Sequence, residues 1–230
     1  MPRIARFVCP GVPHHVTQRG NRRERVFFCD ADYLAYLNHL REYLTRHEVD
    51  VLAYCLMTNH VHLVVVPSAA PALQLLMRSL NACYAQRINR MRNWRGHVWQ
   101  GRYFASALDE AYLWSAIRYV EQNPVRAGMV GKAEDYCWSS APAHCGLGHD
   151  PVLSDREDWH LQVKAVGNWS SWLTQAVDRD SLKTLRENAD KGLPCGSERF
   201  LHSLEAISGR SLAFRTQGRP KRAPAPTNDH

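Results

Sequence analysis

Two histidines separated by one residue, His60 and His62, stand in an apolar stretch that has the composition of a strand. In a strand, residues i and i+2 point to the same face and lie about 6.5–7 Å apart. Both imidazoles can therefore converge on one cation while Val61 faces the core. The four following residues, 63–66, are aliphatic, so a buried strand presents imidazoles where packing favours aliphatic side chains. This pattern predicts a metal site, and a pair of ordinary surface histidines is the alternative.

A second candidate pair, Tyr119 and Asn123, lies in the run Arg-Tyr-Val-Glu-Gln-Asn-Pro. Residues i and i+4 share one face of a helix. Leu113, Ile117 and Val120 form the apolar stripe of that helix, and Tyr119 and Asn123 belong to a neighbouring stripe that can face a sheet. The alternative is a tyrosine at the core edge and an asparagine that closes a helix before Pro124.

The elements expected around these residues follow a defined order. Strands are expected at 14–19, 49–56, 60–66 and 98–108, and helices from about residue 30, from about residue 71, and from Asp109 to about Asn123, where Pro124 disfavours helix. The order β-α-β-β-α-β followed by a helix is that of the ferredoxin-like, split βαβ fold. We therefore predict an α+β protein whose antiparallel sheet carries helices on one face. The open face of such a sheet often binds nucleic acid.

The character of the chain changes after residue 145. We expect one domain over 1–145, a helical C-terminal extension over 146–208, and a basic, largely disordered tail over 209–230, which becomes rich in Pro and Ala.

Charge favours a polyanionic partner. The 230 residues contain 29 Lys and Arg against 22 Asp and Glu, a net charge of +7, and most of the cations are Arg, which is suited to bidentate phosphate contacts. From Val51 to Leu108 there is no acidic residue, and the same holds from Arg210 to Arg222. Two separate basic stretches indicate nucleic acid. A merely solvated basic face is the alternative.

The seven cysteines are odd in number and contain no Cys-x-x-Cys pair, so neither a zinc knuckle nor a disulfide framework is indicated. No apolar run approaches the ~20 residues of a membrane-spanning helix. The first residues lack the apolar segment of a signal peptide. We expect a cytoplasmic protein with reduced thiols and no membrane partner.

Several motifs together resemble the single-tyrosine HUH transposases, in particular the REP-associated tyrosine transposases of bacteria. The resemblance extends almost throughout the chain, and small departures are Thr58, where proline is common, and Pro13-His14, where an aromatic residue often precedes the histidine. The matching runs are Pro10-Gly11, residues 15–21 (HVTQRGN), 54–63 (YCLMTNHVHL), 99–104 (WQGRYF), 118–119 (RY), 123–128 (NPVRAG), 138–140 (WSS), 196–200 (GSERF) and 218–221 (GRPK).

The resemblance implies a metal-dependent, single-stranded DNA endonuclease and strand transferase that acts at hairpin-forming repeat elements through a covalent 5′-phosphotyrosine. By motif position, Tyr119 is the nucleophile and residues 1–145 are the catalytic domain. His60 and His62 are metal ligands and Asn123 is a third, and this mixed donor set suits Mg²⁺ or Mn²⁺. The partner is single-stranded DNA with a REP-like hairpin. A monomer and a homodimer both remain open.

Residues expected to contact DNA combine basic and aromatic side chains. Trp99, Tyr103 and Phe104 are candidates for base stacking, with core packing as the alternative. A basic arm near the C-terminus fits the minor groove, with a nonspecific tail as the alternative. The full set is Arg19, Asn21, Arg22, Arg23, Arg25, Trp99, Arg102, Tyr103, Arg118, Arg126, Arg219, Lys221 and Arg222.

Two other functions compete with this interpretation. One is a non-catalytic, hairpin-binding DNA- or RNA-binding protein, or a regulator, on the same fold. The other is a hydrolytic metallonuclease, but such sites usually need clustered carboxylates for two metals. The acid-free stretch around His60 disfavours that second alternative.

Overall fold

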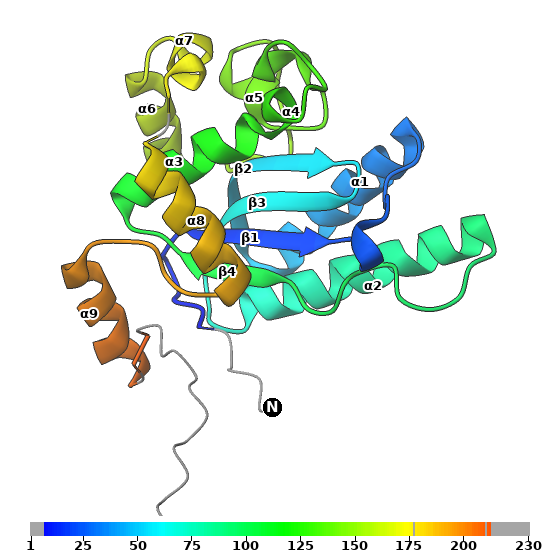
Figure 1. The fold of residues 1–230 in the computed structure, drawn as a ribbon, viewed down its shortest axis with the longest axis horizontal. Coiled ribbons are helices and arrows are strands. Elements are labelled where there is room, and N and C mark those ends of the chain that lie inside the picture. Colours follow the sequence, from blue (N-terminus) through cyan, green and yellow to red (C-terminus); the bar gives the residue numbers. More distant parts are fainter. Residues whose placement is uncertain (1–6, 177, 210, 213–230) are drawn as a thin grey trace, which may run out of the picture.

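The structure is a computed structural model that describes residues 7–176, 178–209 and 211–212 (Figure 1). The predicted basic arm at Arg219, Lys221 and Arg222 lies outside the described residues, as does most of the expected 209–230 tail. Among the residues described, no helix combines the length and apolarity needed to cross a membrane.

Four antiparallel strands form one sheet in the order β2-β3-β1-β4. Helix α1 (Asp30–His47) connects β1 to β2, and helix α2 (Ala72–Arg92) connects β3 to β4. This confirms the predicted α+β fold and its split βαβ order. The strand bounds are β1, His14–Arg19; β2, Val49–Met57; β3, His60–Pro67; and β4, Phe104–Ala107.

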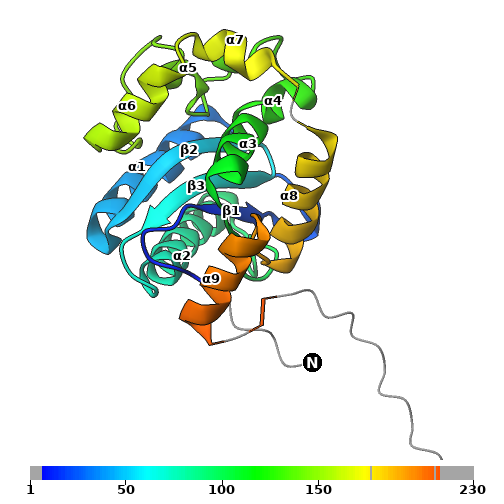
Figure 2. The same ribbon diagram turned by 90° about the vertical axis from the view of Figure 1, so that its left-hand side faces the viewer.

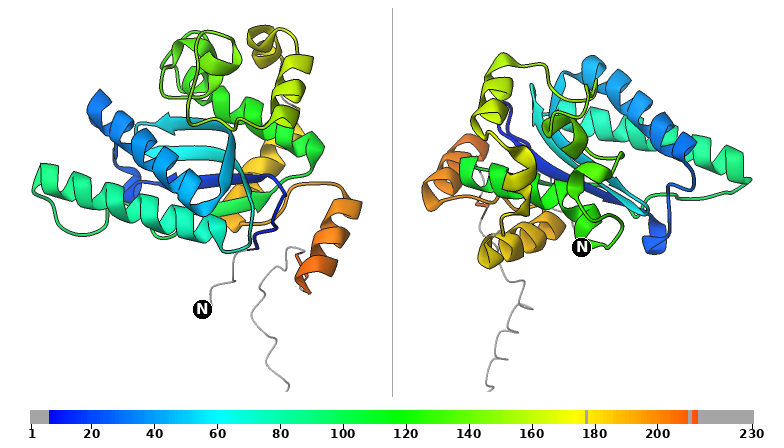
Figure 3. Two further views of the ribbon diagram at one scale, coloured as in Figure 1. Left: turned by 180° about the vertical axis from the view of Figure 1, so that it is seen from behind. Right: turned by 90° about the horizontal axis from the view of Figure 1, so that it is seen from above.

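Helices α1 and α2 cover one face of the sheet, as expected (Figure 3). Strand alternation places Val61, Leu63 and Val65 on this face, where they join Leu40 and Leu76 in the largest core cluster. Each of these side chains is almost fully buried, and burying an aliphatic side chain contributes about 1.5–3 kcal/mol. The side chains of His60 and His62, which alternate with these residues along β3, must then point to the other face.

The other face is not open, because β2 and β3 present apolar side chains there too. Cys55 and Val64 pack against Ile117 and Val120 of helix α3 (Glu110–Glu121) in a second core cluster. Figure 2 shows α3 and helix α8 (Arg179–Lys191) on the side of the sheet opposite α2. The predicted covering of one face by helices therefore holds for α1 and α2. The second face, which was expected to be open, is partly covered by α3 and α8.

The fourth strand is shorter than the predicted 98–108. Gly101 has φ +62° and turns the chain, so only Phe104–Ala107 pairs with β1. Before that turn, the chain contacts the end of β1 through a Gly20–Trp99 bridge and a hydrogen bond from Gln100 N to Arg19 O.

Helix α3 begins as predicted and ends two residues before the predicted end. The side chain of Asp109 accepts a hydrogen bond from Tyr112 N and caps the first turn. Asn123 opens a separate short helix, α4 (Asn123–Arg126), in which Pro124 occupies the first turn, a position that needs no N–H donor.

The C-terminal extension is helical, as predicted, and is fastened to the sheet. Cys195 N donates to Ala107 O, and Asp109 N donates to Cys195 O, so residues next to β4 and the start of α3 hold the chain beyond α8. The remaining elements are α5 (Ala141–His144), α6 (Glu157–Ala165), α7 (Trp169–Thr174), α9 (Glu198–Ser208) and two 3-10 turns, Asn21–Arg23 and Ala133–Asp135.

Candidate metal and nucleophile site

Strand β3 brings His60 and His62 together on the face covered by α3. Their ring centroids lie 4.9 Å apart, and the rings meet edge to face. A third imidazole from the central strand β1, that of His15, stacks on His62 with centroids 5.2 Å apart. The i, i+2 prediction for the pair is therefore met in the fold, and β1 adds a histidine to it.

Hydrogen bonds leave one nitrogen of each predicted ligand available. Nδ1 of His60 lies 2.6 Å from Oδ1 of Asn59, and Nδ1 of His62 lies 2.9 Å from Nε2 of His15. Within the described part of the chain, neither His60 Nε2 nor His62 Nε2 has a hydrogen-bond partner. Two imidazoles with oriented rings and free Nε2 atoms fit a divalent cation, because a ligating histidine commonly donates its other N–H to a neighbour.

Burial keeps these histidines neutral. Desolvation lowers the pKa of His60 to about 4, with a further contribution from the charge of Arg19. Desolvation holds the pKa of His62 well below its usual value, and the neighbouring histidines and arginines lower it further. A neutral imidazole is the form that binds a metal ion, so both side chains are in the form that the predicted metal site requires.

Asn123 is buried next to α3, but its oxygen is engaged. Oδ1 accepts a hydrogen bond of 2.6 Å from Nη2 of Arg126, while the buried Nδ2 has no partner. No group of three or more His, Cys, Asp or Glu side chains among the described residues is arranged to hold a metal ion. The protein donors that fit a cation here are the two imidazoles, which leaves other coordination positions for substrate or water.

Helix α3 places Tyr119 against the histidines. The phenol ring meets His62 edge-on at 5.6 Å between centroids and meets His15 edge-on at 6.0 Å. Tyr119 is half-buried and lines the cleft, so its ring is positioned by packing while it remains accessible to a ligand.

Two guanidinium groups lie over the same phenol ring. Arg126 places its Cζ 4.2 Å from the ring centroid of Tyr119 and donates a hydrogen bond to the backbone oxygen of that residue. Arg186, from α8, places its Cζ 5.6 Å from the centroid. Desolvation lowers the pKa of Arg126, and the charge of Arg186 lowers it further.

The three histidines, Tyr119 and Arg186 line a cleft of about 830 Å³ between the sheet, α3 and α8. Its walls carry Arg19, Arg102, Arg186 and Lys191, and none of its described lining residues is acidic. Low-dielectric walls with charges of one sign concentrate the field in a cleft. The arrangement suits an anionic ligand, and a phosphate in it would lie near Tyr119 and the histidines.

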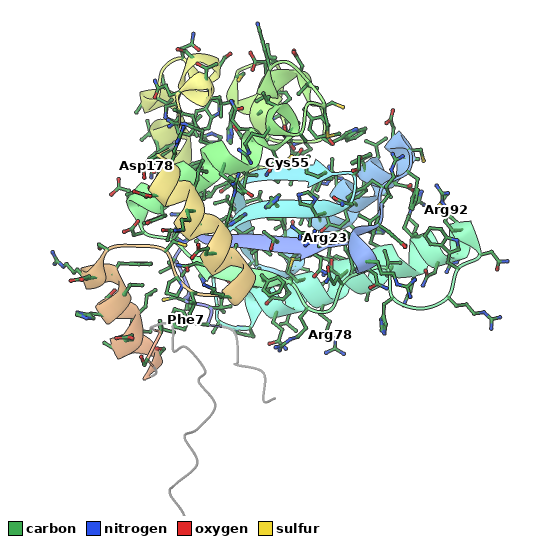
Figure 4. The ribbon with its side chains drawn as sticks, viewed as in Figure 1. Phe7, Arg23, Cys55, Arg78, Arg92 and Asp178 are labelled. Carbon is green, nitrogen blue, oxygen red and sulfur yellow. The ribbon has the colours of Figure 1, made fainter. Side chains whose placement is uncertain are left out.

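The predicted basic loop follows β1. A Cβ atom on Gly20 would lie 2.4 Å from the backbone oxygen of Glu24, so only glycine allows this tight return. Gly20 N donates to Asn59 O, which places the loop beside His60. Arg22, Arg23 and Arg25 are exposed, and Asn21 is half-buried. Figure 4 shows Arg23 at the same end of the molecule as Arg92 of α2.

Trp99 and Tyr103 are core residues. Trp99 is 7% exposed, and its Nε1 donates to the backbone oxygen of Asn81, so its ring is not available for the predicted base stacking. Tyr103 is 6% exposed, although it borders the cleft. Phe104, which is 41% exposed and lines the cleft, is the ring in this run that a base can reach.

The predicted DNA contact Arg118 is engaged elsewhere. Its Cζ lies 4.1 Å from the ring centroid of Trp172, and its Nη2 donates to Gln175. Arg118 thus joins α3 to the extension instead of lining the cleft. Arg126, by contrast, lies at Tyr119, and Arg19 and Arg102 line the cleft.

Three residues of the site were absent from the predicted set. His15 belongs to a run that the sequence singles out, but only the sheet register shows that it reaches His62. Arg186 and Lys191 come from the extension, more than 60 residues beyond Tyr119, and no local pattern marks them.

The fold and the cleft define an α+β protein whose basic site suits a phosphate-bearing ligand. Residues 11–123 match the family model described as "Transposase IS200 like", which assigns this region of the chain to the IS200-like transposase family. The matched region includes both histidines, Tyr119 and Asn123, and membership implies an enzyme that acts on DNA.

Two solved structures are similar to this chain, and the first of them shares its fold. One, described as a REP-associated tyrosine transposase bound to a REP hairpin, aligns with a TM-score of 0.55 at 16% identity over 68% of this chain and 93% of that chain. Another, a candidate transposase from Deinococcus radiodurans, has a TM-score of 0.37 at 19% identity over 53% of this chain and 97% of that chain. No curated protein matches the chain significantly.

Proposed function

We propose that this transposase is a metal-dependent, single-stranded DNA endonuclease and strand transferase that uses Tyr119 as its nucleophile. The observation that carries the proposal is the edge-on placement of the Tyr119 ring 5.6 Å from His62 in a cleft lined by cations and free of described acidic residues. A hydrolytic nuclease with two metals would need clustered carboxylates there.

The reaction is a phosphoryl transfer to tyrosine. Tyr119 Oη attacks the scissile phosphorus, an Oη–P bond forms and the P–O3′ bond breaks. The phenol loses its proton to solvent or a base, and the departing 3′ oxygen takes up a proton. The downstream strand stays on the protein as a 5′-phosphotyrosine, and attack by a 3′-hydroxyl group reverses the step and joins strands. Because the intermediate keeps a phosphodiester bond, rejoining needs no external energy source.

Residues of this chain prepare that step. His60 and His62 would hold a divalent ion, Mg²⁺ or Mn²⁺, which supplies Lewis-acid polarisation of the phosphate. Asn123 would join them only after its oxygen is released by Arg126, because that oxygen now accepts a hydrogen bond. Packing of α3 on the sheet orients the phenol, and the buried wall around His62 excludes water from one side of it.

We further propose a hairpin-forming DNA strand, with a REP-like repeat, as the substrate. The similar structure that contains a REP hairpin supports this choice through its fold. The exposed arginines Arg22, Arg23 and Arg25 lie on the loop after β1, whose last residue, Arg19, lines the cleft. They are proposed to hold phosphates of the stem. Phe104 is proposed to stack a base of the flanking single strand.

The test is covalent capture of labelled DNA. A single-stranded hairpin oligonucleotide, labelled in separate preparations at its 5′ or 3′ end, is incubated with Mn²⁺ and boiled in detergent. We expect the 3′ label to stay on the protein and the 5′ label to be released, because the 5′-phosphate side is the one retained. Hairpin binding without an adduct in Mg²⁺ or Mn²⁺ would instead establish a non-catalytic binding protein.

A further inference from the structure

Helix α8 forms a wall of the candidate site although it lies outside the region that matches the family model, residues 11–123. It crosses the accessible end of the sheet beside β1 and β4 (Figures 1 and 2). Leu185 and Ala189 are buried beneath it, and Ser106 Oγ on β4 donates to Asn188 O. These contacts fix the helix, and Arg186 then lines the cleft.

Arg186 is a cation without a carboxylate partner among the side chains that the structure describes. Within the described residues it makes no ion pair, and its neighbour Glu187 lies 3.9 Å from Lys191 instead. The guanidinium of Arg186 lies over the phenol ring of Tyr119, and the guanidinium of Arg126 lies over the same ring. Two guanidinium groups that converge on one ring repel each other, and a bound anion between them relieves that repulsion.

The side chain also has no structural task in the described fold. Arg186 is exposed and makes no hydrogen bond that would hold α8, whereas the buried neighbours Leu185 and Ala189 provide the packing. The charge of Arg186 therefore lies beside Tyr119 on a helix that packing already fixes. It is suited to binding an anionic ligand.

We propose that Arg186 binds a non-bridging oxygen of the scissile phosphate and holds that phosphate in line with Tyr119. The assignment rests on the proposed function. An arginine suits this role because its guanidinium is always charged and donates charge-assisted hydrogen bonds to phosphate oxygens. The extension is then part of the active site and supplies a catalytic residue to the family domain.

The test measures the coupling between Arg186 and the phosphate charge by binding alone. The cleavage position is first located with the wild-type chain from the length of the released 5′ fragment. Hairpin DNA is then made with either a normal phosphodiester or a neutral methylphosphonate at that position. Binding of both DNAs is measured in a Tyr119→Phe background, which prevents cleavage, with Arg186 or with Arg186→Gln. Arg179→Gln, on the same helix but outside the cleft lining, is the matched control.

We expect Arg186→Gln to raise the Kd for the phosphodiester about tenfold, because one charge-assisted hydrogen bond is lost. The Kd for the methylphosphonate should stay unchanged, because that DNA carries no charge at this position. Arg179→Gln should affect both DNAs alike. With Tyr119 restored, Arg186→Gln should slow adduct formation about 10²–10³-fold, as removal of one donor to a developing charge does. Arg186→Lys should recover part of that rate, because the charge is kept.

Equal effects of Arg186→Gln on the two DNAs, including no effect on either, would overturn this assignment while leaving the proposed function intact. Failure of the wild-type chain to form any adduct would overturn both. Unchanged thermal unfolding of the Arg186→Gln chain is expected, since no described structural contact is removed.

Discussion

Nε2 of His15 on β1 lies 2.9 Å from Nδ1 of His62 on β3, so one predicted metal ligand is oriented by an imidazole of the neighbouring strand. Burial lowers the pKa of His15 to about 4 and that of His62 well below its usual value, so both rings are neutral and share a single proton in this bond. If His62 uses Nε2 for a cation, its Nδ1 must carry the proton and donate it to His15. In that tautomer the bond holds the ring of His62 in a fixed orientation.

This relationship predicts a role for His15 in metal binding. His15→Ala removes the acceptor that orients His62, and we expect the affinity for Mn²⁺ to fall about 10–100-fold, the usual effect of losing such a partner. Calorimetric titration of Mn²⁺ measures it, and His160→Ala, at an exposed site on α6, is the control. Unchanged Mn²⁺ affinity of His15→Ala would show that the bond has no part in metal binding.

The two predicted ligands can be tested separately from DNA binding. His60→Ala and His62→Ala should each reduce adduct formation at least about 100-fold, because each removes a donor from an open site. Hairpin affinity should change little, since phosphate contacts by arginines supply most of it. Adduct formation and gel-shift affinity are measured on the same preparations. Equal cleavage by metal-free and metal-loaded protein would contradict the metal assignment.

A buried histidine away from the cleft predicts acid sensitivity. His14 lies in the core, where Cys9 N donates to its Nε2 and its Nδ1 contacts Val12 O, so the neutral ring is satisfied. Burial lowers its pKa from 6.5 to about 4. Between these values the unfolded chain binds a proton that the native chain does not, so stability is full above pH 6.5 and is lost as the pH falls towards 4.

The expected slope for this group is about 1.4 kcal/mol of unfolding free energy per pH unit in that window. His14→Gln cannot titrate, and its stability should fall less than that of the wild-type chain between pH 7 and pH 5. His15 and His60 contribute in the same direction in both proteins. Urea unfolding at the two pH values measures the difference, and parallel losses would refute the role of His14.

The C-terminal end of α3, the helix that carries Tyr119, is anchored by the extension. Trp169 Nε1 donates to the buried Glu121 carboxylate at 2.7 Å, and Gln122 Nε2 donates to Leu173 O at 2.7 Å. Trp169→Phe keeps a ring but leaves a carboxylate oxygen without its donor. We expect a loss of about 1–3 kcal/mol in unfolding free energy together with slower adduct formation.

Trp172→Phe is the matched control for that substitution. Its indole N–H makes no hydrogen bond among the described residues, and phenylalanine retains a face for Arg118. Denaturant unfolding of both variants compares the two tryptophans. A Trp169→Phe protein as stable as the control would show that the bond to Glu121 contributes little.

Sequence patterns within single helices and strands were enough to predict most of the fold. The apolar composition of residues 49–56 and 60–66 gave bounds close to those of β2 and β3, and the expected starts of α1, α2 and α3 lie close to those observed. The fourth strand was overextended because a favourable composition continues through Gly101, whose positive φ ends the pairing.

Side-chain partners between distant elements escaped prediction. The residues around Trp99 are compatible with a ring that stacks on DNA or with a ring in the core. The structure places Trp99 in the core, because its side chain is buried and its Nε1 donates to Asn81 O. Arg118 and Arg186 have the same residue type, yet one stacks on Trp172 and the other lies over Tyr119. That choice depends on how the extension packs, which no local spacing encodes.

The most direct test of the account is the position of the DNA on the protein. After reaction with a hairpin oligonucleotide, the adduct is digested with nuclease and trypsin and analysed by mass spectrometry. Trypsin cuts after Arg118 and Arg126, so residues 119–126 form a peptide whose one tyrosine is Tyr119, while Tyr103 and Tyr112 lie together in residues 103–118. The account predicts a nucleotide phosphate on the 119–126 peptide and no adduct in Tyr119→Phe. A nucleotide on the 103–118 peptide, or an adduct that persists in Tyr119→Phe, would contradict it.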